Sequence, residues 1–207
     1  MNIVDYILLV LLVAMIIIGS KKGLVREITA LLTLIPAVIV SINFMDSFSV
    51  FVYERVGGSP MVVTFLSFII LLGMAYATFK LIGMGIARVI NLPKKGKKDQ
   101  MGGAFIGFMR GWVIISFIFF LLFLLPMPAK FYVSVEQSFF GPIMVKTVPI
   151  MYESTSALHA HSPSFYGKVE SALELRKSSS GEMDDNTRAE VKSVLFQIQR
   201  FFDVGVR

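Results

Sequence analysis

The chain has no cysteine among its 207 residues, and charged residues make up only 16% of it. The absence of cysteine excludes a disulfide framework, a thiolate nucleophile and a cysteine-ligated metal site. A soluble domain carries roughly 25% charged residues, so the small charged fraction argues against a soluble domain. Hydrophobic residues, in contrast, make up 55% of the chain. Together with a mean hydropathy of +0.73, this composition indicates a membrane protein.

The sequence also lacks the short motifs of common enzymes. No nucleophile elbow, P-loop, HExxH sequence or dinucleotide fingerprint occurs in it. Histidine occurs only at His159 and His161, with no acidic cluster beside them, and two such residues make a weak metal site. We therefore expect a solvated loop at these histidines, and a protein without enzymatic activity, bound metal or cofactor.

Four long apolar segments dominate the first part of the chain, at residues 3–19, 28–44, 62–79 and 102–125. Each has about the 17–25 residues that a helix needs to cross a hydrocarbon core of ~30 Å. The sequence therefore predicts an all-α, multi-pass membrane protein, with four transmembrane helices in a bundle over residues 1–125. Residues 45–60 are expected to form a loop, and residues 80–92 an amphipathic helix at the membrane surface.

Basic residues are concentrated in two of the links between these segments. The first link contains Lys21, Lys22 and Arg26, and the third, within a polar loop expected at residues 93–100, contains Lys94, Lys95, Lys97 and Lys98. Cytoplasmic loops are enriched in Lys and Arg, so we expect both links in the cytoplasm and both termini on the opposite side. Residues 126–207 carry equal numbers of acidic and basic residues, so the net charge of +6 belongs to residues 1–125. We expect this charge to contact anionic lipid headgroups and not nucleic acid.

The fourth apolar segment contains three glycines spaced by four, Gly103, Gly107 and Gly111. Residues four apart lie on one face of a helix, and glycines there let another backbone approach closely. We expect this face to pack against another helix of the same bundle. Contact with a second copy or another membrane protein, and a ligand groove, are the alternatives.

Charged side chains are scarce within the apolar segments, which makes Arg110 in the fourth segment notable. A charge within a span costs roughly 2.5–3.5 kcal/mol on insertion scales. We expect Arg110 to offset this cost by reaching the lipid headgroups, or by pairing with Glu27 at the start of the second segment. Arg26 and Glu27 are adjacent residues of opposite charge and are expected at the same level of the membrane as Arg110. A role of Arg110 in transport or gating is the alternative.

Residues 126–207 are more polar than the segments before them and are expected to form an extracytoplasmic tail. Apolar residues at helical spacing predict two amphipathic helices in it, over residues 164–177 and 184–202. The stretch 178–186 between them is expected to be a flexible joint. Each helix has an apolar face that needs a partner, and the candidates are the bundle, the membrane surface and another chain.

Three motifs together resemble the colicin V production protein family. They are Asp5 and Tyr6 before the first apolar run, GxxKGLVRE at residues 19–27, and GGAFIGFMRG at residues 102–111. The resemblance covers about residues 1–125, and the tail has no pattern that matches. It implies a small multi-pass protein of the bacterial inner membrane, required for production or export of a peptide toxin. The motif positions carried over are Gly23, Arg26, Glu27, Gly103, Gly107, Arg110 and Gly111, none with a catalytic role.

The sequence thus favours a non-catalytic inner-membrane protein, with periplasmic termini, that supports toxin production or export, or envelope homeostasis. One alternative is a small channel or transporter in which Arg110 and Glu27 line an oligomeric pore. Another is a membrane-anchored scaffold whose tail binds a periplasmic partner. Transporters usually contain several polar residues within the membrane, so the scarcity of intramembrane charge disfavours the channel or transporter.

Overall fold

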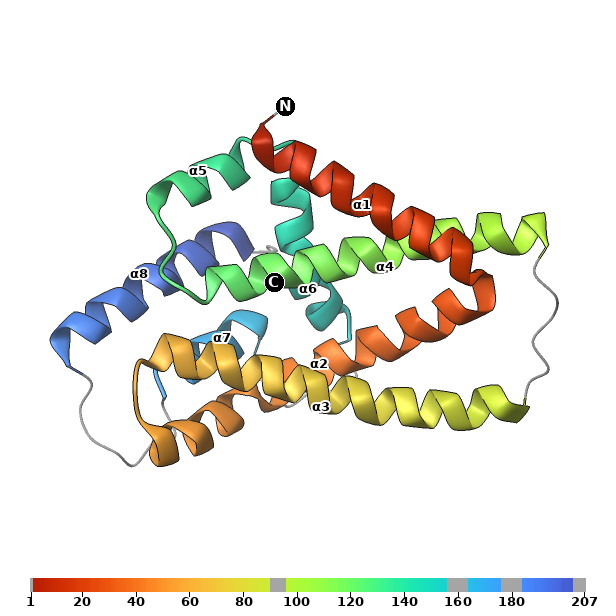
Figure 1. The fold of residues 1–207 in the computed structure, drawn as a ribbon. Helices are drawn as coiled ribbons and strands as arrows, with labels where there is room; N and C mark the ends of the chain where they lie inside the picture. Colours follow the sequence, from red (N-terminus) through yellow and green to blue (C-terminus); the bar gives the residue numbers. More distant parts are fainter. Residues whose placement is uncertain (1, 90–95, 156–163, 176–183, 203–207) are drawn as a thin grey trace.

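The structure is a computed structural model that describes residues 2–89, 96–155, 164–175 and 184–202. Within these ranges every regular element is a helix (Figure 1). The helices long and apolar enough to cross a membrane are α1 (Ile3–Lys22), α2 (Leu24–Val56), α3 (Pro60–Val89) and α4 (Lys97–Phe123). The prediction of an all-α protein with four candidate transmembrane helices is therefore confirmed.

Helix α2 is longer than the predicted span over residues 28–44. Residues 45–56, expected to be a loop, continue the helix, and only residues 57–59 connect it to α3. The loop prediction is wrong because the first breakers in this stretch are Gly57 and Gly58, whose φ angles of 67° and 100° end the helix. With 33 residues, α2 is about 50 Å long. It therefore extends beyond a hydrocarbon core of ~30 Å.

Helices α3 and α4 also differ from the sequence prediction, α3 at its C-terminal end and α4 at its N-terminal end. Helix α3 runs without a break to Val89, so residues 80–89 of the expected amphipathic extension are helical and continue the third span, while residues 90–92 lie outside the described residues. Residues 97–100 were expected to belong to a polar loop, but they form the first turn of α4. Asp99 in this turn accepts a hydrogen bond from the backbone N–H of Leu24 at 2.9 Å, which fixes the turn against the start of α2.

The four long helices lie side by side in the order α1, α4, α2, α3 (Figure 1). Chain neighbours α1 and α2 are joined through Gly23 alone and diverge from it. Helix α4 therefore lies between α1 and α2, and the main contact of α1 is with α4. This order brings the third link of the chain next to the first, although more than 70 residues separate Leu24 from Asp99.

The tail contains four described helices: α5 (Ala129–Glu136), α6 (Gly141–Ser154), α7 (Phe165–Leu173) and α8 (Asp185–Phe202). The two helices expected at residues 164–177 and 184–202 correspond to α7 and α8, with α7 ending earlier than expected. The sequence analysis missed α5 and α6. The flexible joint lies mostly outside the described residues, and Asp185 and Asn186 already belong to α8.

The tail packs back onto α2 and α4 rather than standing apart. Helix α6 contacts α4, and α7 contacts α2. Aromatic side chains of α4 and the tail form one core, in which the ring centroids of Phe120 and Phe165 are 5.3 Å apart and those of Phe123 and Phe202 are 5.1 Å apart. The bundle, the membrane surface and another chain were the candidate partners of the tail helices. In the structure, the tail helices pack against the bundle.

Candidate functional site

The three glycines of α4 form a seam with α1. A Cβ added at Gly107 would lie 2.7 Å from the carbonyl oxygen of Met15 and 2.8 Å from the Cα of Gly19. Gly103 likewise faces the backbone of Gly19 and Gly23, whereas Gly111 faces the side chain of Met15, and all three glycines are buried. Only glycine permits this approach of two backbones, which gains van der Waals contact along the seam. The glycine face is thus covered by α1 of the same chain.

The corner between α1 and α2 lies at one end of this seam. Gly23 has a φ of 87°, which favours glycine, and a Cβ there would meet the Asp99 carboxylate. Asp99 holds the corner through its hydrogen bond to Leu24. The sequence analysis gave Gly23 as a motif position but did not single out Asp99. An acidic residue within a run of lysines was the available signal.

The basic residues predicted to set the topology gather around this corner where the structure describes them. Lys21 and Lys22 end α1, and Lys97 and Lys98 begin α4; all four are exposed. Arg26 is exposed as well. Lys94 and Lys95 lie outside the described residues, as do His159 and His161.

Arg110 and Glu27 meet at the interface of α4 and α2. Arg110 Nη1 lies 3.1 Å from Glu27 Oε2, with the Glu27 side chain fully buried and the Arg110 side chain 11% exposed. Lys22 Nζ approaches the other carboxylate oxygen at 3.8 Å. Among the described residues, neither Glu27 oxygen has a partner with hydrogen-bond geometry. The pair is therefore held by charge attraction in a site shielded from water.

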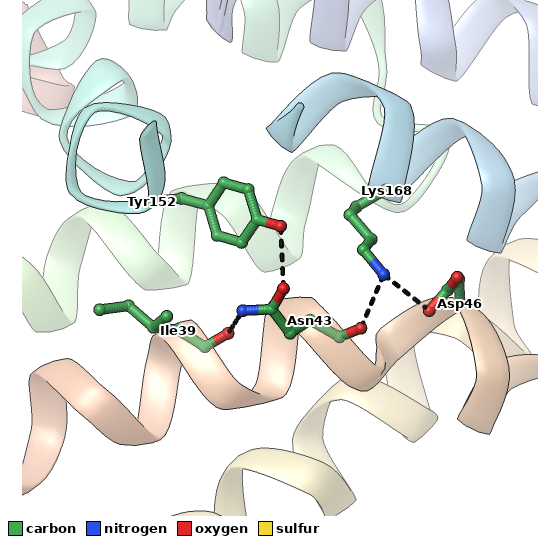
Figure 2. Close-up of polar contacts among 5 residues, drawn as sticks. All are labelled: Ile39, Asn43, Asp46, Tyr152 and Lys168. Atoms are coloured by element: carbon green, nitrogen blue, oxygen red, sulfur yellow. Dashed lines mark hydrogen bonds and ion pairs between the residues drawn. The ribbon is translucent and has the colours of Figure 1, made fainter. Parts of the chain in front are cut away.

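A second buried ion pair ties the tail to α2 (Figure 2). Lys168 of α7 places its Nζ 2.9 Å from the backbone oxygen of Asn43 and 3.4 Å from Asp46 Oδ1. Tyr152 of α6 donates its hydroxyl to Asn43 Oδ1 at 3.0 Å, and Asn43 donates its amide to the backbone oxygen of Ile39 at 3.1 Å. Helices α2, α6 and α7 therefore meet in one polar cluster.

Asp5 forms a third buried polar contact, at the opposite end of α1 from the corner. Its Oδ1 accepts hydrogen bonds from Ser138 Oγ at 2.6 Å, from the backbone N–H of Phe139 at 2.9 Å and from that of Phe140 at 3.3 Å. Its Oδ2 accepts one from the backbone N–H of Asn2 at 3.0 Å. The carboxylate therefore neutralises the positive end of α6 and fixes it to the start of α1.

The colicin V production protein family model matches residues 4–149. The chain belongs to this family. The match includes all four candidate spans, α5 and most of α6, and so extends beyond the resemblance noted for residues 1–125. Neither the comparison with curated proteins nor that with solved structures gave a match.

The family-matched region contains most of the buried contacts described above. The glycine seam, the Arg110–Glu27 pair and Asp5 with its partners lie within it, whereas Lys168 and helices α7 and α8 follow it. Helices α7 and α8 thus add to the family region a segment that packs into its core through aromatic side chains, such as Phe165 and Phe202, and through the buried charge of Lys168. Within the described residues, no group of three or more His, Cys, Asp or Glu side chains is placed to hold a metal ion.

Proposed function

We propose that this member of the colicin V production protein family acts in the bacterial inner membrane to support production or export of a peptide toxin, or envelope homeostasis. The observation that carries the proposal is the family match over residues 4–149, which includes every candidate span. The name of the family suggests the process, and the four long apolar helices support a location in a membrane.

The proposed role is non-catalytic. In support of this, the buried charged groups that the structure describes serve to join helices. Asp5 holds α6 to α1, the Glu27–Arg110 pair joins α2 to α4, and the Asp46–Lys168 pair joins α2 to α7. Such groups fix which helices pack together and in which register, because an unpaired polar atom within a membrane raises the free energy of the folded protein.

The lipid bilayer is the partner we propose at the basic corner. Lys21, Lys22, Lys97 and Lys98 are exposed and belong to the same end of the neighbouring helices α1 and α4. Each basic residue near a membrane surface with anionic lipids contributes about 1 kcal/mol of attraction. This arrangement supports a cytoplasmic position for the corner and periplasmic termini.

The test is deletion of the gene in a host that secretes a peptide toxin of the colicin V type. Toxin activity in the culture supernatant is expected to fall and to return when the chain is supplied from a plasmid. Leakage of a periplasmic marker enzyme, measured in the same cultures, reports on the envelope. Unchanged toxin secretion together with an unchanged envelope would contradict the proposal.

A small channel or transporter is the second candidate, favoured by the ion pair within the spans. Glu27 and the Nε of Arg110 lack hydrogen-bond partners among the described residues, which is unusual for buried charged groups. Purified chain in proteoliposomes would conduct ions if this candidate were correct, and Arg110→Gln would change the flux. Flux equal to that of protein-free vesicles would exclude the channel and leave the supporting role.

A further inference from the structure

Helix α6 exposes an apolar stripe although it follows the candidate spans. Ile143 is 55% exposed and Ile150 is 45% exposed, and Phe139, just before the helix, is 71% exposed. Positions 143, 146 and 150 lie on one face of a helix because their spacings are three and four. Lys146 is the exposed residue between the two isoleucines. A helix in water would present mainly polar side chains on such a face.

The position of α6 links this stripe to the candidate spans. The turn just before it is hydrogen-bonded to Asp5, within the first turn of α1. The middle of α6 is hydrogen-bonded to α4, because Trp112 Nε1 donates to Thr147 Oγ1 at 2.9 Å. Trp112 lies near the centre of α4, and its ring is 6.3 Å from that of Phe140. In Figure 1, α6 crosses α4 on its way from the N-terminal end of α1 towards α2.

We propose that α6 is a membrane-embedded helix that begins at the boundary between headgroups and acyl chains, on the side of the N-terminus, and descends among the acyl chains to the level of Trp112. Phe139, Ile143 and Ile150 insert among the acyl chains. The methylene groups of the Lys146 side chain lie against the acyl chains, and its ammonium group reaches anionic headgroups. The proposal requires that α1 and α4 cross a membrane, and is independent of the role in toxin production.

Lipid is the occupant that the structure favours for this stripe. Helix α1, to which α6 is bonded, is itself lined with exposed apolar side chains such as Tyr6 and Val10, at 59% and 64% exposure. The helix joined to the start of α6 thus already exposes apolar side chains, as expected of a span in contact with acyl chains.

The absence of native cysteine allows a direct test by spin labelling. Single variants Ile143→Cys and Ile150→Cys carry a nitroxide in vesicles of phosphatidylethanolamine and phosphatidylglycerol. The collision rates of the nitroxide with oxygen, which partitions into acyl chains, and with a water-soluble nickel chelate are then measured. The controls are Val10→Cys on α1 and Ser193→Cys, an exposed polar position on α8.

The ratio of oxygen to nickel collisions at positions 143 and 150 is expected to shift to the value at position 10. A ratio equal to that at position 193 would place the stripe in water and overturn the proposal. Low collision rates with both reagents would show that protein covers the stripe, and would overturn it as well. The fluorescence of Trp112, the single tryptophan, shows whether each variant keeps its fold, and Phe139→Cys replaces any variant that does not.

Discussion

Gly107→Ile is expected to abolish recovery of folded protein in mild detergent. The added side chain would enter the backbone of α1, with its Cβ 2.7 Å from the carbonyl oxygen of Met15. Two backbones cannot yield as a flexible side chain does, so α1 and α4 must separate. The cost is expected to be about 3 kcal/mol or more, at the upper end of the range for overpacking. The measurement is the fraction of monodisperse protein in size-exclusion chromatography.

The matched control is Gly73→Ile, a glycine within α3. No neighbouring heavy atom lies within 4 Å of a Cβ added at Gly73. An isoleucine there adds apolar surface to a site without neighbours, so recovery should equal that of the unsubstituted chain. Equal recovery of both variants would mean that α1 and α4 do not pack through the glycines, and the seam would have to be abandoned.

Lys168→Met is expected to lower the free energy of unfolding by about 3 kcal/mol, because it takes the cation away from a buried carboxylate. The Lys168 and Asp46 side chains are 9% and 5% exposed, so water screens their interaction little. The double variant Lys168→Met with Asp46→Asn should recover much of the loss, since neither charge is then buried alone. Thermal unfolding in detergent, followed by circular dichroism, measures both effects.

A surface ion pair provides the comparison for Lys168. Arg200 Nη2 lies 2.7 Å from Glu136 Oε1, but the side chains are 48% and 50% exposed. Arg200→Met should therefore cost no more than about 1 kcal/mol. If Lys168→Met cost as little as Arg200→Met, the cluster of Figure 2 would not be what fixes the tail to α2.

Features that depend on helical spacing could be predicted from the sequence. The four apolar segments are long enough to reveal spans, and the spacing of Gly103, Gly107 and Gly111 places them on one helix face whatever the fold. The pairing of Arg110 with Glu27 is one of the two expectations that the sequence gives for Arg110, because both charges lie towards the same end of their spans. Which helix meets the glycines depends on the packing order, and the sequence does not contain that order in any local pattern.

Contacts between distant residues escaped the sequence analysis. Asp46 was assigned to a loop, so nothing suggested a partner 122 residues away in α7. In the sequence Asp5 stands out only as part of the motif before the first apolar run, and its partners in the turn before α6 are more than 130 residues away. Helix α6 itself was missed because Pro142 and Pro149 suggested irregular structure. Pro142 occupies the first turn, where proline is tolerated, and Pro149 lies within a helix that packing stabilises.

The central claim is a four-span protein whose tail returns to the side of its N-terminus. The contact of Asn2 Nδ2 with the backbone oxygen of Ser134, at 3.1 Å, already joins the two. Labelling with a membrane-impermeant maleimide tests the claim most directly, in spheroplasts that express Ser59→Cys, Lys98→Cys or Ser193→Cys. We expect positions 59 and 193 to react in intact spheroplasts and position 98 to react only after lysis. Protection of position 193 before lysis, or reaction of position 98, would contradict the four-span arrangement.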